Sequence, residues 1–213
     1  MCVLACFSQV DADQANVILI FADDQGYGDL SCFGSETINT PHIDRLAKEG
    51  RKFTNFMVAS PVCTPSRAAL MTGCYPKRVG MHQHVLFPTS KKGLNPSEHT
   101  IADHLKGQGY ATACFGKWHL GDQPEFLPLA QGFDRYFGIP YSNDMWPGNG
   151  RGHRHTKKPY TPLPIVDQDK AVAFVADALD QTLLSESITD KAVEWIKEQQ
   201  GSDAQEDMYD HQA

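Results

Sequence analysis

One segment decides how this chain is interpreted: Pro61-Val62-Cys63-Thr64-Pro65-Ser66-Arg67-Ala68-Ala69-Leu70-Met71-Thr72-Gly73. We predict a helix that begins just after Cys63, with Thr64 as its N-cap, Pro65 at its first position and Gly73 closing it in the left-handed conformation. The unpaired N–H groups of a helix N-terminus favour an anion such as sulfate or phosphate, and Arg67 adds a full charge. Cys63 is then either a nucleophile beside an oxyanion or a buried structural cysteine, since free cysteines are often buried.

The composition is that of a globular protein. The chain has 213 residues, of which 41% are hydrophobic, enough for one domain with a buried core. A formal net charge of −7 disfavours general nucleic-acid binding, and no apolar run approaches the roughly 20 residues of a membrane helix. The six cysteines form no Cys-x-x-Cys pair, so neither a zinc pattern nor a dense disulfide framework is indicated.

The N-terminal residues 1–15 resemble the apolar end of a secretory signal. Val10-Asp11-Ala12 is similar to a small-x-small cleavage site. We therefore expect an exported protein.

An acidic pair follows the first apolar run. Asn16 to Ala22 has the continuous, β-branched character of a strand covered on both faces, and it ends directly on Asp23 and Asp24. Ligands of open α/β sheets bind at the carboxyl ends of strands. Two adjacent carboxylates repel each other unless a cation joins them, and oxygen ligands favour Ca²⁺ or Mg²⁺. The alternative is an ordinary solvated turn.

Strands and helices alternate along the rest of the chain. Helices are predicted within 39–50, 99–109 and 187–200, and strands over 53–59 and 110–115. This alternation is typical of an α/β domain with a mostly parallel sheet. Residues 75–97 are rich in Pro, Gly, Lys and His and are predicted to form a long loop that lines a pocket, with His82 and His84 at the surface.

The strand over 110–115 leads into Gly116-Lys117-Trp118-His119-Leu120-Gly121. If this segment is extended, Lys117 and His119 lie on one face and Trp118 on the other. A cation and an imidazole together suit an anionic ester whose leaving oxygen needs a proton. A Lys and a His in a surface turn are the alternative.

Three segments together resemble the type I sulfatases. Their signature, Cys-x-Pro-Ser-Arg followed by x-x-Leu-x-Thr-Gly, is matched at every position by residues 63–73. Asp23 to Leu30 and Gly116 to Gly121 are similar to two further motifs of the family, and Phe133 to Asp144 resembles the stretch in which a serine, here Ser142, lies at the site. The resemblance implies an alkaline-phosphatase-like three-layer α/β/α fold.

The resemblance also implies a site and its cofactors. Cys63 would be oxidised to formylglycine by a formylglycine-generating enzyme. Asp23, Asp24 and residue 63 would bind Ca²⁺ in preference to Mg²⁺, and Lys117 and His119 would contact the sulfate. Arg67 would stabilise charge that develops on the transferred group together with Lys117, and Ser142 would lie at the site. The expected substrate is a sulfated small molecule or a sulfated glycan, and the expected location is secreted, periplasmic or lysosomal.

The resemblance covers residues 16–200, which correspond to about the N-terminal half of a family member. The family's further His and Lys residues and the Asp-Asn pair that completes the calcium site are not found here, and residues 201–213 are polar and acidic, which predicts a disordered tail. Two alternatives therefore stay open: a phosphonate or phosphodiester hydrolase of the same superfamily, and a fragment that binds anions without hydrolysing them.

Overall fold

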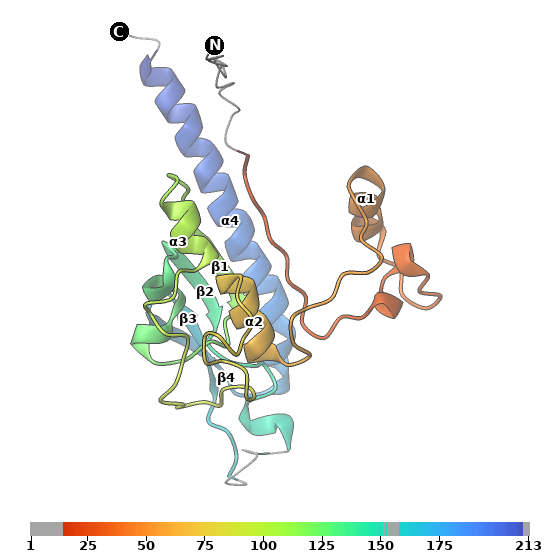
Figure 1. The fold of residues 1–213 in the computed structure, drawn as a ribbon, viewed down its shortest axis with the longest axis vertical. Coiled ribbons are helices and arrows are strands. Elements are labelled where there is room, and N and C mark those ends of the chain that lie inside the picture. Colours follow the sequence, from red (N-terminus) through yellow and green to blue (C-terminus); the bar gives the residue numbers. More distant parts are fainter. Residues whose placement is uncertain (1–14, 151, 153–157, 211–213) are drawn as a thin grey trace, which may run out of the picture. The chain divides into compact units, whose positions relative to one another are not determined.

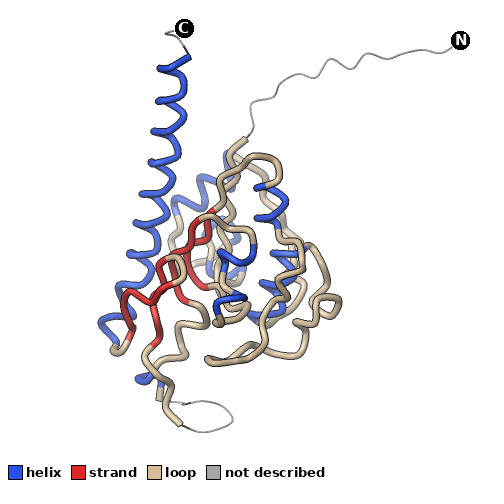
Figure 2. Tube along the Cα trace, turned by 90° about the vertical axis from the view of Figure 1, so that its left-hand side faces the viewer, coloured by secondary structure: helices blue, strands red, loops and turns tan. Residues whose placement is uncertain are grey.

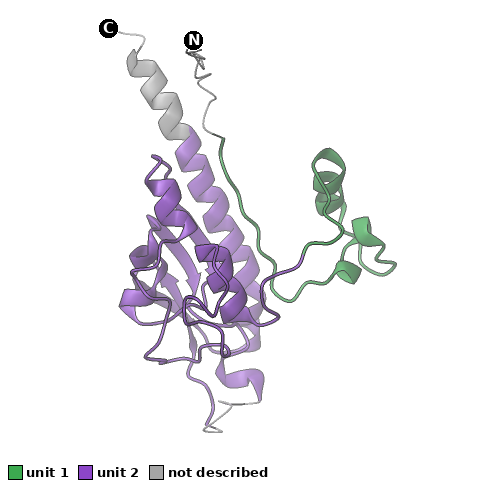
Figure 3. Cartoon of the chain, in the orientation of Figure 1, with its two compact units in different colours: residues 1–56 green, residues 57–213 purple. Residues whose placement is uncertain are grey.

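The computed structural model describes residues 15–150, 152 and 158–210, and of residues 201–210 the backbone alone. The chain divides into two compact units, residues 1–56 and residues 57–213 (Figure 3). The signal-like residues 1–14 lie outside the described part.

The first unit contains two short 3-10 helices, Tyr27–Asp29 and Ser31–Phe33, and helix α1 (Pro41–Glu49). The bounds of α1 agree with the helix predicted within residues 39–50. Asp44 joins α1 to the second 3-10 helix by accepting hydrogen bonds from Ser31 Oγ at 2.6 Å and from the backbone N–H of Cys32 at 2.8 Å. The hydrogen bond from Ser31 makes the largest contribution to a lowered pKa of Asp44.

The strands predicted over 16–22 and 53–59 are not formed. None of residues 15–112 is assigned to a strand, and the side chains of Ile18 and Ile20 are 69% and 81% exposed. A strand needs a neighbouring strand for its backbone hydrogen bonds and a layer of side chains over its apolar face. The described residues of unit 1 supply neither to residues 16–22.

The second unit is built on a four-stranded sheet with the order β1 (Ala113–Lys117), β2 (Arg135–Ile139), β3 (Leu163–Asp167) and β4 (Lys170–Val175). Strands β1 and β2 are parallel, whereas the β2–β3 and β3–β4 pairs are antiparallel. The sheet is therefore mixed where a mostly parallel one was expected, because β3 and β4 form a hairpin whose tight turn places Gln168 at a φ of 60°.

Helices cover both faces of this sheet (Figures 1 and 2). Helix α2 (Cys63–Thr72) and helix α3 (Ile101–Lys106) lie on one side, and helix α4 (Ala178–Asp210) lies on the other. Ala68 of α2 belongs to the same buried cluster as Tyr136 of β2, while Leu184 of α4 packs with Ile139 on the opposite face. The second unit thus has three layers.

Helix α4 is longer than the predicted helix over 187–200. It begins at Ala178, where Asp177 accepts a hydrogen bond from the N–H of Asp180 and the Asp180 carboxylate accepts one from the N–H of Ala176. Its bounds extend to Asp210. The disordered tail over residues 201–213 stays a prediction. None of the described helices is long and apolar enough to cross a membrane.

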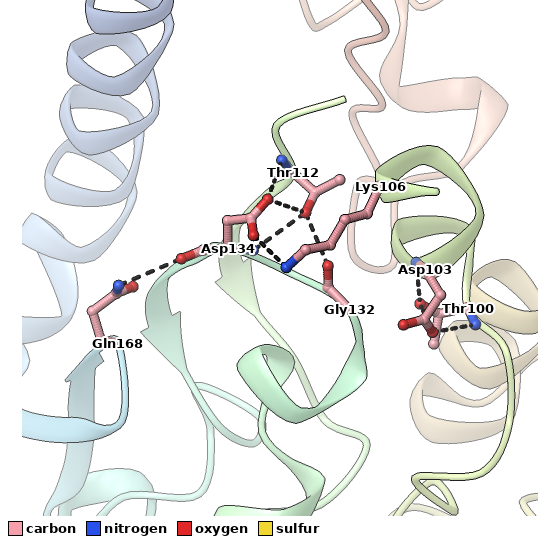
Figure 4. A network of polar contacts seen from close by, with 7 residues as sticks. All are labelled: Thr100, Asp103, Lys106, Thr112, Gly132, Asp134 and Gln168. Carbon is pink, nitrogen blue, oxygen red and sulfur yellow. Dashed lines mark hydrogen bonds and ion pairs between the residues drawn. The ribbon is translucent and has the colours of Figure 1, made fainter. Parts of the chain in front are cut away.

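A polar network ties α3 to the start of β2 (Figure 4). Asp134 pairs with Lys106 of α3 and accepts hydrogen bonds from the backbone N–H and the hydroxyl of Thr112, both at 3.0 Å. Thr100 caps α3 by accepting from the N–H of Asp103 at 3.2 Å, and its hydroxyl also donates to the carbonyl of Gln131 at 2.7 Å. These bonds set α3 against the ends of the parallel strands.

Candidate active site

Helix α2 begins at Cys63 itself, with Val62 as the N-cap residue. The prediction that Thr64 caps the helix is wrong, because the Thr64 hydroxyl has two other partners. It donates to the backbone carbonyl of His119 at 2.8 Å and accepts from the backbone N–H of Leu86 at 3.1 Å. Gly73 closes the helix at a φ of 64°, as predicted.

Lys117 lies within hydrogen-bond distance of two other predicted site residues. Its Nζ lies 3.3 Å from Cys63 Sγ and 3.2 Å from Ser142 Oγ. Lys117 ends β1, and Ser142 follows the end of β2, which is parallel to β1, so both lie at the same edge of the sheet. A half-buried sulfur, a cation and a buried hydroxyl therefore meet at the N-terminus of α2.

Arg67 binds the backbone of the same strand. Its Nη1 donates to the carbonyl of Lys117 at 2.5 Å, which holds α2 against β1. Two buried groups lie near the guanidinium. Burial raises the pKa of Cys114 to about 12 and raises the pKa of Tyr136 well above its usual range, while the positive charge of Arg67 opposes both shifts. A thiol with so high a pKa is not a thiolate at neutral pH, and the thiolate is the reactive form of cysteine.

His119 does not follow the expected alternation with Lys117. The strand ends at Lys117, and His119 has a φ of 62°, in the left-handed region. Its side chain is almost fully buried, and Nε2 lies 2.8 Å from the carbonyl oxygen of Leu86. Since a carbonyl can only accept, Nε2 carries a proton in this contact. Trp118 packs in the core.

Asp23 and Asp24 belong to the first unit, and both are exposed there. Asp24 has a φ of 56°. Their carboxylate oxygens have the donor chemistry that Ca²⁺ and Mg²⁺ prefer. Two residues are fewer than a calcium ion needs, and the described part of the chain holds no group of three or more His, Cys, Asp or Glu side chains suited to a metal.

The predicted long loop does line a hollow. Residues between Val79 and Pro96, together with Thr64 and Phe126, surround a cavity of about 700 Å³. The hollow lies within the second unit, and its wall includes both apolar and polar side chains. Sequence reasoning assigned no role to Leu86 in this loop because Leu86 acts through its backbone groups, which leave no pattern in a sequence.

Comparison with known proteins places this arrangement in a family. The family model described as Sulfatase matches residues 15–206. Mouse steryl-sulfatase is 47% identical over 176 residues, which cover 76% of this chain and 28% of the relative. Human arylsulfatase A is 54% identical over 134 residues, which cover 62% of this chain and 26% of the relative. The chain belongs to the sulfatase family and spans little more than a quarter of these relatives.

Solved structures agree with this assignment. The structure of Ps i-CgsB matches with a TM-score of 0.69 and 33% identity over 84% of this chain and 40% of the other. The PsFucS1 sulfatase from Pseudoalteromonas sp. matches with a TM-score of 0.67 and 28% identity over 82% of this chain and 39% of the other. BT4656, solved with its substrate D-glucosamine-2-N,6-O-disulfate, matches with a TM-score of 0.58 and 26% identity over 82% of this chain and 29% of the other. The fold is the alkaline-phosphatase-like α/β fold of sulfatases.

Proposed function

We propose that this protein hydrolyses sulfate esters, with Cys63 converted to formylglycine. The observation that carries the proposal is the meeting of Cys63, Lys117 and Ser142 at the N-terminus of α2 in a chain of the sulfatase family. A hydrated formylglycine supplies one hydroxyl to attack sulfur and a second to expel sulfate.

The chain's own residues bind the anion and stabilise its charge. The ammonium of Lys117, within hydrogen-bond distance of position 63, offsets negative charge that develops on the sulfuryl oxygens. Ser142 orients that ammonium, and the first N–H groups of α2 face the same position. Arg67 holds the carbonyl of Lys117, so its contribution is in part to keep this cation in place.

Calcium is the proposed metal, held by the carboxylates of Asp23 and Asp24 and by residue 63. Their oxygen donors fit a hard cation, and such an ion would polarise a sulfate oxygen. Further ligands are needed beyond these residues. The proposed substrate is a sulfated small molecule or a sulfated glycan, supported by the names of the steryl- and aryl-sulfatase relatives and by the sulfated sugar bound to BT4656.

Maturation and location follow from the same proposal. A formylglycine-generating enzyme would act on Cys63, and the protein would be exported to a secreted, periplasmic or lysosomal location. The support for export is the signal-like sequence of residues 1–15.

The proposal is tested by producing the 213-residue chain in a host that carries the converting enzyme. Peptide mass should show formylglycine at position 63, and an aryl sulfate should be turned over. Cys63→Ser should abolish turnover, whereas Cys32→Ser, in the first unit, should retain it. A plain thiol at Cys63 contradicts the proposal. Faster turnover of matched phosphate or phosphonate esters would favour the phosphodiesterase alternative instead.

Calcium titration addresses the metal and the possibility of a non-catalytic fragment. Stoichiometric binding that is lost in Asp23→Asn but kept in Asp29→Asn supports the proposed site. If the unmodified chain and both variants bind calcium equally weakly, this chain does not form the site by itself.

A further inference from the structure

Three hydrogen bonds, one buried and two partly buried, form a closed ring through Thr64, Leu86 and His119. The Thr64 hydroxyl donates to the carbonyl of His119 at 2.8 Å, the N–H of Leu86 donates to the Thr64 hydroxyl at 3.1 Å, and His119 Nε2 contacts the carbonyl of Leu86 at 2.8 Å. The ring joins the start of α2, the loop over 79–96 and the segment after β1. Thr64 and His119 are each only 1% exposed, so water does not readily replace a bond that is lost.

The ring fixes the backbone of His119. A non-glycine residue at a φ of 62° is in an unfavourable conformation that its surroundings must hold. Both backbone groups of His119 are held: its N–H donates to the carbonyl of Pro140 at 3.1 Å, and its carbonyl accepts from Thr64. The Thr64 hydroxyl is therefore one of the groups that anchor this residue.

The ring also sets the imidazole tautomer. Because Thr64 holds the N–H of Leu86, it places the Leu86 carbonyl that accepts from Nε2. A proton on Nε2 makes Nδ1 the acceptor nitrogen of the neutral ring. Thr64, the residue next to Cys63, thus contacts both the backbone of His119 and the residue that accepts from its imidazole.

We propose that Thr64 is a positioning residue for His119. The expected effect on turnover rests on the proposed sulfate-ester hydrolysis, whereas the expected effect on the His119 tautomer does not. The Thr64 hydroxyl couples the helix that carries Cys63 to His119 and to the wall of the 700 Å³ hollow.

The test compares Thr64→Val, which keeps the shape and removes the hydroxyl, with Thr64→Ser, which keeps the hydroxyl. Thr112→Val is the matched control, since it removes another buried hydroxyl that bonds Gly132 and Asp134 outside the site. Imidazole ¹⁵N chemical shifts report the tautomer, and His119→Gln assigns the His119 signals. We expect an Nε2-protonated ring in the parent, in Thr64→Ser and in Thr112→Val, and a changed tautomer balance in Thr64→Val.

Turnover adds a second measurement. At equal formylglycine content by peptide mass, Thr64→Val should lower kcat by about 10- to 100-fold with KM little changed, because misplacement of a group in the site slows chemistry more than binding. Thr64→Ser should restore kcat.

Unchanged His119 shifts in Thr64→Val overturn the proposal. If Thr64→Val does not fold, the parent spectrum decides, since a ring without a proton on Nε2 contradicts the contact. A parent that shows no turnover refutes the proposed function alone, because the ¹⁵N shifts still decide the role of Thr64.

Discussion

Among single residues, Lys117 is the most informative. Its ammonium contacts both Cys63 and Ser142, and these contacts join residues that are 54 and 25 positions apart in the chain. The sequence motifs predicted all three residues for the site, and the structure places them within hydrogen-bond distance. Their catalytic roles stay predictions.

Lys117→Met should lower kcat for an aryl sulfate by about 100-fold or more, because removing one charge-stabilising donor has effects of that order. Lys106→Met, which removes an ammonium from the network around Asp134, serves as the control and should leave kcat nearly unchanged. Equal losses in both variants would mean that the Lys117 ammonium has no special role.

The lowered pKa of Asp134 predicts that the stability of the fold depends on pH. Desolvation raises the pKa of its carboxyl, but the hydrogen bonds from Lys106 and Thr112 outweigh it, so the pKa in the folded protein lies below the usual 3.8. The stabilisation is therefore fully present above the usual pKa and is lost as the pH falls through the lowered one.

Asp134→Asn should remove the contribution to stability that is lost in acid. It should lower the free energy of unfolding at neutral pH by about 1 kcal/mol, since a charged acceptor is lost from a side chain that water partly screens. Urea unfolding of both proteins between about pH 3 and about pH 7 measures the effect. Parallel stability curves across that range would contradict the role of Asp134 shown in Figure 4.

Among the elements, the parallel pair β1–β2 depends on a close approach of two glycines. A Cβ placed on Gly138 would lie 1.9 Å from the carbonyl oxygen of Gly116. A side chain at position 138 would push apart the two strands whose ends carry Lys117 and Ser142. The strands therefore need glycine for their spacing.

Gly138→Ala should lower the free energy of unfolding by about 1–3 kcal/mol, as overpacking does in well-packed cores. Gly107→Ala is the matched control, because a Cβ there meets backbone atoms only at 3.4 Å and the φ of −64° suits alanine. Thermal unfolding followed by circular dichroism gives both values. A smaller effect for Gly138→Ala than for Gly107→Ala would contradict the assigned spacing.

Element boundaries were predictable where local chemistry sets them. Pro41 and Gly50 bracket α1, and Thr100 with Asp103 caps α3, because capping uses residues that are neighbours in sequence. The hairpin of β3 and β4 was missed. Its signal was an Asp-Gln-Asp turn between two apolar runs, which lacks the glycine that usually marks such a turn.

For the molecule as a whole, residues 16–22 show that an apolar sequence pattern does not by itself predict a strand. Their apolar, β-branched run predicts a buried strand, but Val17 and Leu19 are 59% and 54% exposed. A strand is a property of a sheet, and an apolar run becomes one only where other strands pair with it. The same holds for the proposed calcium site, because Asp23 and Asp24 would make only part of a coordination shell.

The amino-acid sequence alone was enough to indicate the family and most of the site. Its motifs are side-chain patterns at fixed spacing, and those patterns pointed to Cys63, Lys117 and Ser142. The mixed sheet, the helix start at Cys63 and the ring through Thr64, Leu86 and His119 depend instead on the tertiary structure. The physical reason is that this ring joins residues 22 to 55 positions apart and that each of its bonds uses a backbone N–H or carbonyl group, which no sequence pattern records.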